Sequence, residues 1–381
     1  MAGKPNGTIG ILTAGGDCPG LNAVIRGVSK AAMHYGIKVI GIRDGFRGLV
    51  ENCTMPLDNA LVSGVLTHGG TFLGSSRDKP HKMQVGNKTV DRTDDAVRTY
   101  RKLKLDCLVC LGGNGTQKTA FRLHNRGGIN VLTLPKTIDN DVAETDITFG
   151  FDSAMAIATE AIDRLHTTAT SHQRIIVCEI MGHSAGWLCL GAGIAGGADV
   201  ILIPEIPYDL EAVARHILER QQAGKRFSLI AVAEGVVSRE EAKARATADR
   251  LTNELGALTR IVTHPSSQSG EGVHLVQEPV ASRIARNLQQ LTGVEARVTS
   301  LGHVQRGGPP TPFDRLLCTR LGTMAGELLA DHHYNIMVGL KGTECVPVPL
   351  KRVAGIKRIV PPNHPWIKTA RLVETCLGAD T

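Results

Sequence analysis

The sequence has few aromatic residues and no dense basic run, which argues against a nucleic-acid-binding protein. Phenylalanine, tryptophan and tyrosine together make up 3% of the 381 residues. Single-stranded nucleic acids need aromatic stacking platforms, and duplexes need clustered lysine and arginine. No five consecutive residues are basic, although Lys and Arg outnumber Asp and Glu by 43 to 36. This modest positive charge indicates cations arranged around small anionic ligands, and we expect no nucleic-acid partner.

Long hydrophobic runs are also missing. No apolar stretch reaches the roughly 18 residues that a transmembrane helix needs, and the N-terminal residues lack the pattern of a secretory signal. The nine cysteines are an odd number, and no second pair follows Cys107 and Cys110 at zinc-site spacing. We therefore expect reduced thiols and a cytoplasmic protein that does not enter a membrane.

Gly/Ser linkers, low-complexity segments and short internal repeats are absent, so the sequence marks domain boundaries only faintly. A chain of 381 residues is nevertheless too long for one ordinary compact domain and predicts two. The chain does contain short apolar runs that alternate with helical patterns. Continuous apolar runs are typical of parallel strands covered on both faces, so we predict an α/β fold with largely parallel sheets. The runs begin at Thr8, Ile37, Asp106, Ile129, Arg174, Val200 and Phe227.

Helical patterns separate these runs. One helix is predicted near Pro19, another over residues 153–169, and a third between Pro279 and Gly293. The polar stretch 238–272 contains REEAKARATADR, which predicts an exposed helix, and we expect a mobile loop at residues 264–272. The apolar face of the third helix is predicted to consist of Val280, Ile284, Leu288 and Leu291.

Three turns after apolar runs carry candidate chemistry. The turn GGD at residues 15–17 and the turn in LGGNG both lead into a helix, where backbone N–H groups and glycine favour a phosphate. The third turn, LPKTIDNDV, carries Lys136, Asp139 and Asp141. The carboxyl ends of parallel strands share one sheet edge, so we expect the three turns to line one crevice. A solvated surface turn is the alternative for the two aspartates.

Two later blocks, SHQR and GHVQRGG, place arginine near histidine. A guanidinium fork fits phosphate oxygens, so Arg174 and Arg306 are candidate phosphate ligands. A structural ion pair is the alternative for each arginine, and His303 is equally a candidate core histidine.

Nine blocks in order resemble the 6-phosphofructokinase family, over about residues 8–320. TIDND and GHVQRGG are the most specific. The resemblance implies two doubly wound α/β domains with the active site in the cleft between them. Residues 1–150 with about 305–355 would form the phosphoryl-donor domain, and residues 151–304 with about 356–381 the sugar-phosphate domain. The other blocks are GILTAGGDCPGLNAVIRG, GGTFLGSSR, LGGNGT, SHQR, MGHSAGW, AGGAD and AEG.

The resemblance implies phosphoryl transfer from ATP to the 1-hydroxyl of fructose 6-phosphate, a step of glycolysis. Asp139 matches the family's proton-accepting base, and Thr137, Asp141 and Lys136 accompany it. Mg²⁺ is the expected cofactor, since this reaction depends on positioning and charge neutralisation. Donor contacts match Gly15, Arg77, Asn114, Gly115 and Thr116, and sugar-phosphate contacts match Arg174, Met181, Gly182, His183, Glu234, Arg297, His303 and Arg306.

The resemblance also implies that subunits share their substrate sites. Arg174 and Arg297 match residues that a neighbouring subunit contributes, so we expect a homo-oligomer, either a dimer or a tetramer, with closed symmetry.

Two positions give different predictions of the phosphoryl donor. Gly115 stands where pyrophosphate users of the family carry aspartate, and its lack of a side chain leaves room for the α-phosphate of ATP. Lys136 stands where most ATP users carry glycine and pyrophosphate users carry lysine. We weight Gly115 more, because steric exclusion is harder to evade than one added charge. ATP is therefore the predicted donor, and pyrophosphate is the alternative.

Two departures from the family pattern suggest a third hypothesis, a catalytically weak regulatory subunit. Asn114 stands where the family has a Mg²⁺-binding aspartate, and an amide offers a weaker ligand. His183 replaces a common arginine, and Lys136 is a candidate to compensate for the missing charge.

Overall fold

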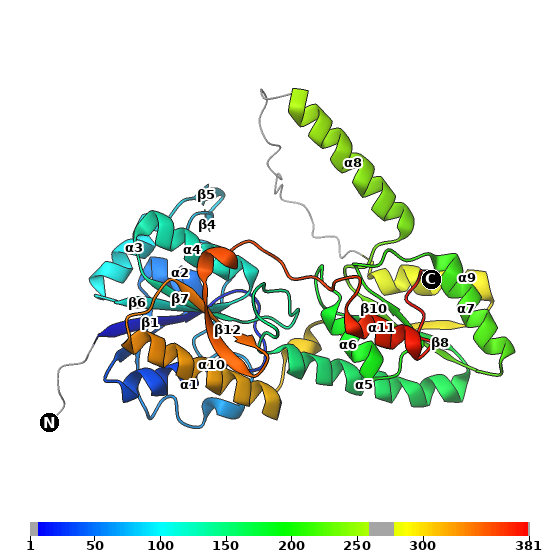
Figure 1. Cartoon of the computed structure of the whole chain (residues 1–381), viewed down its shortest axis with the longest axis horizontal. Coiled ribbons are helices and arrows are strands. Elements are labelled where there is room, and N and C mark those ends of the chain that lie inside the picture. Colours follow the sequence, from blue (N-terminus) through cyan, green and yellow to red (C-terminus); the bar gives the residue numbers. More distant parts are fainter. Residues whose placement is uncertain (1–6, 259–277, 380–381) are drawn as a thin grey trace. The chain divides into compact units, whose positions relative to one another are not determined.

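The computed structural model of the chain describes residues 7–258 and 278–379, which form an α/β protein (Figure 1). Among these residues no helix is both long and apolar enough to cross a membrane. The chain divides into two compact units, each with its own sheet and apolar core. The first unit comprises Met1–Ile157 and His303–Ile359, and the second comprises Ala158–Gly302 and Val360–Thr381.

A seven-stranded sheet forms the frame of the first unit. Its strands are β1 (Thr8–Thr13), β2 (Lys38–Ile42), β3 (Thr54–Leu57), β6 (Cys107–Gly112), β7 (Val131–Pro135), β12 (Ile336–Lys341) and β13 (Glu344–Pro349), and a separate hairpin joins β4 (Met83–Val85) to β5 (Lys88–Val90). The order is β13-β12-β7-β6-β1-β2-β3. The five central strands are parallel, and β13 and β3 pair antiparallel at the two edges.

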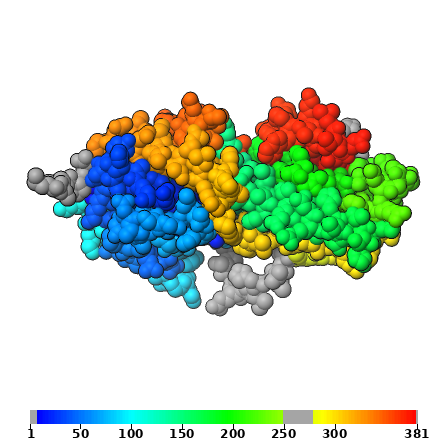
Figure 2. Space-filling model, turned by 90° about the horizontal axis from the view of Figure 1, so that it is seen from below, coloured from blue at the N-terminus to red at the C-terminus, as the bar shows by residue number. Residues whose placement is uncertain are grey.

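Helices cover both faces of this sheet, which explains why its central strands are continuous apolar runs. The helices are α1 (Leu21–His34), α2 (Gly45–Glu51), α3 (Thr93–Lys102), α4 (Asn114–Gly127) and α10 (Pro312–Ala330), with short 3₁₀ turns at Val65–Thr67, Gly302–Arg306 and Leu350–Arg352. Figure 1 shows α1 and α10 together on one face, and Figure 2 shows α10, in gold, along α1, in blue. Glycine permits this close packing: a Cβ on Gly27 would lie 3.3 Å from the Cα of Gly322.

The second unit contains a parallel sheet of order β11-β8-β10-β9. Its strands are β8 (Ile175–Ile180), β9 (Val200–Leu202), β10 (Ser228–Ala233) and β11 (Ala296–Ser300). Its helices are α5 (Phe151–His172), which begins in the first unit, α6 (Trp187–Ala195), α7 (Leu210–Gln222), α8 (Arg239–Leu258), α9 (Val280–Thr292) and α11 (Pro365–Leu372). Cys376 forms a parallel bridge with Val200, so the C-terminal segment pairs with the edge strand β9.

All seven predicted apolar runs form strands, and the prediction of an α/β fold with largely parallel sheets is confirmed. The strands β3–β5 and β11–β13 were not anticipated. β11 illustrates the reason: its sequence ARVTS carries few apolar side chains, and its backbone is ordered by pairing with β8 rather than by its own pattern.

The predicted apolar face of α9 is wrong at one position. Ile284 and Leu288 are buried and Val280 is partly buried against the same core, but Leu291 is 47% exposed. Leu291 lies in the last turn of α9, one residue before the helix ends at Thr292, where the core that covers the earlier turns does not reach it. The helix predicted from REEAKARATADR is confirmed as part of α8, and its residues 243–248 are exposed, whereas the loop predicted at residues 264–272 lies outside the described residues.

Candidate active site

Three parallel strands bring the candidate turns of the first unit to one sheet edge. β6 lies between β1 and β7, and Leu111 is paired with both Thr13 and Leu134. The turns that follow these strands therefore emerge side by side, as predicted. Backbone hydrogen bonds join them, since Ala14 N–H donates to the Leu111 carbonyl at 3.0 Å and Lys136 N–H donates to the Gly112 carbonyl at 3.2 Å.

The turn after β7 is held in one conformation by its own polar groups. Asn140 adopts a left-handed backbone with φ 51°, and its side-chain oxygen accepts from Thr148 N–H at 3.0 Å. The Thr148 hydroxyl donates to the Thr137 carbonyl at 2.7 Å, and Thr137 Oγ1 accepts from Asp139 N–H at 3.0 Å. Asp139 is half-buried, whereas its neighbours in the turn are buried. The solvated-turn alternative does not fit this burial.

Asn114 connects the turn after β6 to the turn after β7. Its amide nitrogen donates to the Asp141 carboxylate at 2.7 Å and to the Asp141 carbonyl at 2.9 Å. Its side-chain oxygen, Oδ1, is buried and has no hydrogen-bond donor among the residues that the structure describes. Asn114 is also the first residue of α4, and the first turn of a helix has N–H groups without intrahelical partners. This end of α4 can therefore receive an anion beside an unused amide oxygen.

The orphaned oxygen of Asn114 also fits an oxygen-coordinated divalent cation. Such cations bind carbonyl and carboxylate oxygens, and Mg²⁺ in particular uses one or two protein groups together with substrate phosphates. In the described part of the chain, no cluster of three or more His, Cys, Asp or Glu side chains could hold a metal ion by itself. The residues present thus suit a cation that arrives with phosphate.

Lys136 and Arg306 place two cations beside the first turn. Lys136 is only 5% exposed, and its ammonium donates to the carbonyl of Gly16. Burial lowers the pKa of Lys136, and the charge of Arg306 lowers it further, while Asp139 opposes the shift. Arg306 lies so close to Gly16 that a Cβ there would be 2.5 Å from the guanidinium. His303, in the same 3₁₀ turn, is exposed, which excludes the core-histidine alternative.

The predicted donor contacts surround this edge. Gly15 N–H donates to the Ser76 carbonyl at 2.8 Å, so the exposed Arg77 follows a segment bonded to the first turn. Thr116 is buried, and its hydroxyl lies 3.4 Å from the Ala14 carbonyl. Gly115 is exposed, and a Cβ built on it would meet nothing within 4 Å. Space therefore opens above the start of α4.

In the second unit, the predicted sugar contacts follow the carboxyl ends of β8 and β10. Met181, Gly182 and His183 come after β8, and Glu234 comes after β10. The Glu234 carboxylate accepts from His183 N–H at 2.7 Å and thereby holds the turn from the neighbouring strand. The turn is tight, since His183 has φ 53° and a Cβ on Gly235 would lie 1.9 Å from the His183 carbonyl.

Arg174 and Arg297 lie at the opposite edge of the same sheet. Arg174 immediately precedes β8, whereas Met181 immediately follows it. The six residues of β8 separate the two edges by about 20 Å. Both arginines bind Glu295, with 2.6 Å between Arg174 Nε and the carboxylate. The structure therefore confirms an ion pair for Arg174 and does not bring it to the turn that carries Met181.

Sequence reasoning missed a buried carboxylate that binds the chain segment following the turn after β7. Asp314, at the start of α10, is fully buried and accepts hydrogen bonds from Gly150 N–H at 3.0 Å and Ser153 N–H at 2.9 Å. Thr311, which caps α10, donates in return to Asp152 at 2.6 Å. Burial raises the pKa of Asp314 to about 6. The TPFD pattern, a capping residue three positions before an acid, was the available signal.

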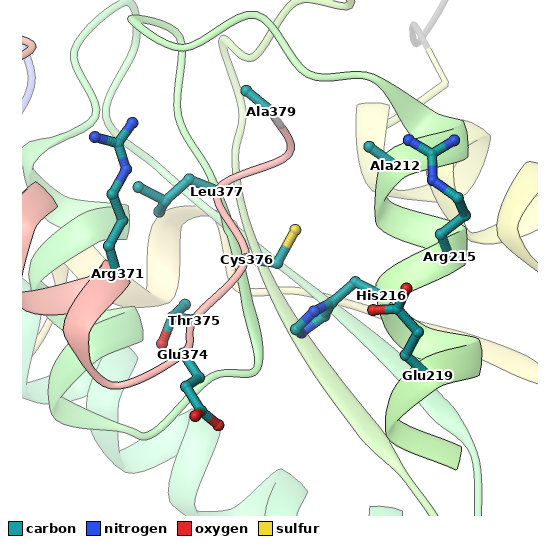
Figure 3. Close-up of a pocket in the computed structure, with 10 residues that line it drawn as sticks. All are labelled: Ala212, Arg215, His216, Glu219, Arg371, Glu374, Thr375, Cys376, Leu377 and Ala379. Carbon is teal, nitrogen blue, oxygen red and sulfur yellow. The ribbon is translucent and has the colours of Figure 1, made fainter. Parts of the chain in front are cut away.

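A separate cavity of about 320 Å³ lies in the second unit between α7 and the C-terminal segment (Figure 3). Arg215 and Arg371 stand on opposite sides of it, and Glu219 and Glu374 also line it. None of the predicted site residues lines this cavity. Its charges of both signs do not select one class of ligand.

The strand-end turns, the two cations and the open start of α4 are the features expected of an α/β protein that binds phosphoryl groups. The chain matches the model of the family described as "Phosphofructokinase" over residues 8–329. A protein of Spirochaeta thermophila named "ATP-dependent 6-phosphofructokinase" is 52% identical over 376 residues, which cover 97% of each chain. The chain therefore belongs to the phosphofructokinase family.

Solved structures agree with this assignment at the level of the fold. The phosphofructokinase of Saccharomyces cerevisiae superposes with a TM-score of 0.74 at 27% identity, over 91% of this chain and 45% of that one. This chain thus spans less than half the length of the yeast chain. A pyrophosphate-dependent phosphofructokinase from Nitrosospira multiformis superposes with a TM-score of 0.77 at 18% identity, over 98% of this chain and 92% of that one. At that identity the likeness shows the fold alone.

Proposed function

We propose that this protein transfers a phosphoryl group from ATP to the 1-hydroxyl of fructose 6-phosphate, giving fructose 1,6-bisphosphate in glycolysis. The observation that carries the proposal is the shared edge of β1, β6 and β7, where a carboxylate, two cations and a helix start converge. The name of the Spirochaeta relative supports both the reaction and the donor.

Asp139 is the general base of the proposed reaction. Its half-buried carboxylate accepts the proton of the sugar hydroxyl as that oxygen attacks the γ-phosphorus of ATP. Thr137 fixes the backbone of Asp139 through the 3.0 Å hydrogen bond, and Asp141 orients Asn114. Lys136 and Arg306 supply positive charge where the transferring group is most negative, and the burial of Lys136 strengthens its effect.

The donor lies with its phosphates against the start of α4 and the first turn. Gly15, Gly115, Thr116 and the helix N–H groups are placed to receive them, and Arg77 adds charge from the neighbouring loop. Asn114, through its unpartnered Oδ1, and the neighbouring carboxylate of Asp141 would hold Mg²⁺ together with those phosphates. The bound cation would neutralise phosphate charge. We expect the enzyme to act in the cytoplasm, since all nine cysteines are free thiols.

ATP is favoured over pyrophosphate by the open space at Gly115, which a side chain would fill. Pyrophosphate stays the second candidate because Lys136, a cation suited to a compact anion, lies buried at the same edge. The fold does not separate the two donors, because a pyrophosphate-dependent enzyme shares it. Gly115→Asp therefore tests the choice: turnover with ATP should fall at least about tenfold, and an unchanged rate would contradict the steric argument.

We propose that subunits of a homo-oligomer, a dimer or a tetramer, share the sugar-phosphate sites. Met181, Gly182, His183 and Glu234 lie at one edge of the four-stranded sheet, and Arg174 and Arg297 lie at the other. A single copy of this sheet cannot direct both groups at one small ligand. The two arginines therefore serve the site of a neighbouring subunit, and His303 and Arg306 are further proposed contacts of the phosphate.

One assay tests this function. Purified protein is given fructose 6-phosphate and Mg²⁺ with either ATP or pyrophosphate, and fructose 1,6-bisphosphate is measured. We expect turnover with ATP. Turnover with pyrophosphate but not with ATP would show that pyrophosphate is the donor. No product with either donor would favour a regulatory subunit, which the substitutions Asn114 and His183 suggested.

A further inference from the structure

Glu295 lies between the two arginines at the amino edge of the four-stranded sheet. One of its carboxylate oxygens accepts from Arg174 Nε at 2.6 Å, and the other contacts a terminal nitrogen of Arg297. Both oxygens of one carboxylate are thus occupied by two different guanidinium groups. The hydrogen bond from Arg174 lowers the pKa of Glu295, so the carboxylate is ionised at neutral pH.

The register of two parallel strands produces this arrangement. β8 pairs with β11 so that Ile175 lies opposite Ala296, and Ile175 N–H donates to the Glu295 carbonyl at 3.0 Å. Arg174 and Glu295, one residue earlier on each chain segment, are therefore neighbours. Arg297 is the second residue of β11 and follows Glu295 by two residues, so along extended backbone the two side chains project to the same side. Strand pairing alone brings the three charges together.

We propose that Glu295 is a positioning residue that holds Arg174 and Arg297 as one unit for binding the phosphate of fructose 6-phosphate. This inference rests on the proposed function, in which the two arginines bind that phosphate. Glu295 acts on the substrate only through the arginines. It engages Arg174 through Nε, and the two terminal nitrogens that form the fork are not used by this bond.

Two effects of Glu295 oppose each other. Its charge repels a phosphate, but its side chain is 42% exposed, so water and salt screen that repulsion. Without Glu295, two guanidinium groups of like charge would separate, and each flexible side chain would have to be ordered when the phosphate binds. Water screens the repulsion but does not remove the cost of ordering, so positioning dominates and Glu295 strengthens binding.

A second ion pair in the same unit offers a matched control. Arg286 and Glu278 have side-chain exposures of 57% and 49%, close to the 59% and 42% of Arg297 and Glu295. In both pairs the glutamate lies just before an element: Glu278 precedes α9 and Glu295 precedes β11. No proposed substrate contact depends on the pair of Arg286 and Glu278. If Glu295 had a purely structural role, removing the charge of Glu295 and removing that of Glu278 should have similar effects on the KM for fructose 6-phosphate.

The test compares Glu295→Gln, Glu295→Asp and Glu278→Gln with the unmodified oligomer. Glutamine retains the shape but one acceptor oxygen only, so we expect the KM for fructose 6-phosphate to rise about fivefold to tenfold, with kcat within about twofold. Aspartate, which retains both oxygens, should recover part of the loss. Glu278→Gln should leave KM unchanged, and all thermal unfolding temperatures should agree closely.

Equilibrium dialysis with labelled fructose 6-phosphate separates this inference from the proposed function, because it needs no turnover. Weaker binding by Glu295→Gln supports the positioning role even if the unmodified protein transfers no phosphoryl group. Unchanged binding overturns it, and tighter binding would assign Glu295 the opposite role, that of a competitor for the arginines.

Discussion

The carboxyl edge of the seven-stranded sheet, called the buried edge below, and the amino edge of the four-stranded sheet, called the exposed edge, both carry charged residues. They differ in how far these residues are buried and in what they contact. At the first, Lys136 is 5% exposed, and Asn114 binds Asp141 at 2.7 Å within one cross-bonded network. At the second, Arg297 has 59% of its side chain exposed and contacts the neighbouring carboxylate of Glu295. The buried edge is organised for chemistry by its own unit. Under the proposed function, the exposed edge presents its two arginines to a substrate bound by a neighbouring subunit.

The largest expected effect is a loss of kcat when a catalytic residue of the buried edge is replaced. Asp139→Ser removes the general base, so kcat should fall by at least about 10²-fold, in line with the contribution of a positioned base. The dissociation constant for fructose 6-phosphate, measured by equilibrium dialysis, should change little. A variant that keeps more than a tenth of the activity would remove Asp139 from this role.

A loss at the lower limit of that range is expected from Lys136→Met, which retains the length of the side chain but not its charge. We expect kcat to fall about a hundredfold, as when one donor to a developing charge is removed. Lys118→Met, on the exposed face of α4, is the control and should retain activity. Equal rates for the two variants would show that the buried cation does not act on the transferring group.

At the exposed edge we expect an effect on binding instead. Arg174→Ala should raise the KM for fructose 6-phosphate roughly tenfold or more, the loss of a charge-assisted hydrogen bond. Mixing this variant with Asp139→Ser after dissociation and reassembly should restore activity, because some shared sites then contain both native residues. If the mixture is no more active than the Arg174→Ala variant alone, the two residues serve sites within one chain.

The smallest effect concerns the packing beneath the buried edge. The pKa of Asp314 is raised to about 6 in the folded state from an ordinary 3.8, so the folded protein binds the proton more tightly. Its stabilising contribution is full below about pH 4 and is lost as the pH rises through 6, by an amount on the order of 3 kcal/mol. Relative to Asp314→Asn, the free energy of unfolding from urea titrations should fall between pH 4.5 and pH 7. A difference that does not vary with pH would contradict the raised pKa.

Much of the buried edge followed from local sequence. The runs that became β1, β6 and β7 are continuously apolar, and the glycines and acids after them mark turns. Parallel strands then require those turns to share an edge. The exposed edge was less visible, because β11 has the weak pattern ARVTS and forms only against β8. Glu295 was missed for the same reason: nothing in the sequence indicates its proximity to Arg174, which is 121 residues away.

The sequence by itself determined the α/β class, the strand-end turns and the nature of the residues at them, because apolar continuity and glycine placement are local properties. Tertiary structure decided which charges meet. Burial of Lys136 beside Arg306, the contact of Asn114 with Asp141 and the bridging of Arg174 and Arg297 by Glu295 all depend on strand register and on packing between distant segments. Hydrophobic patterning is encoded residue by residue, whereas the electrostatic environment of a side chain exists only once the chain has folded around it.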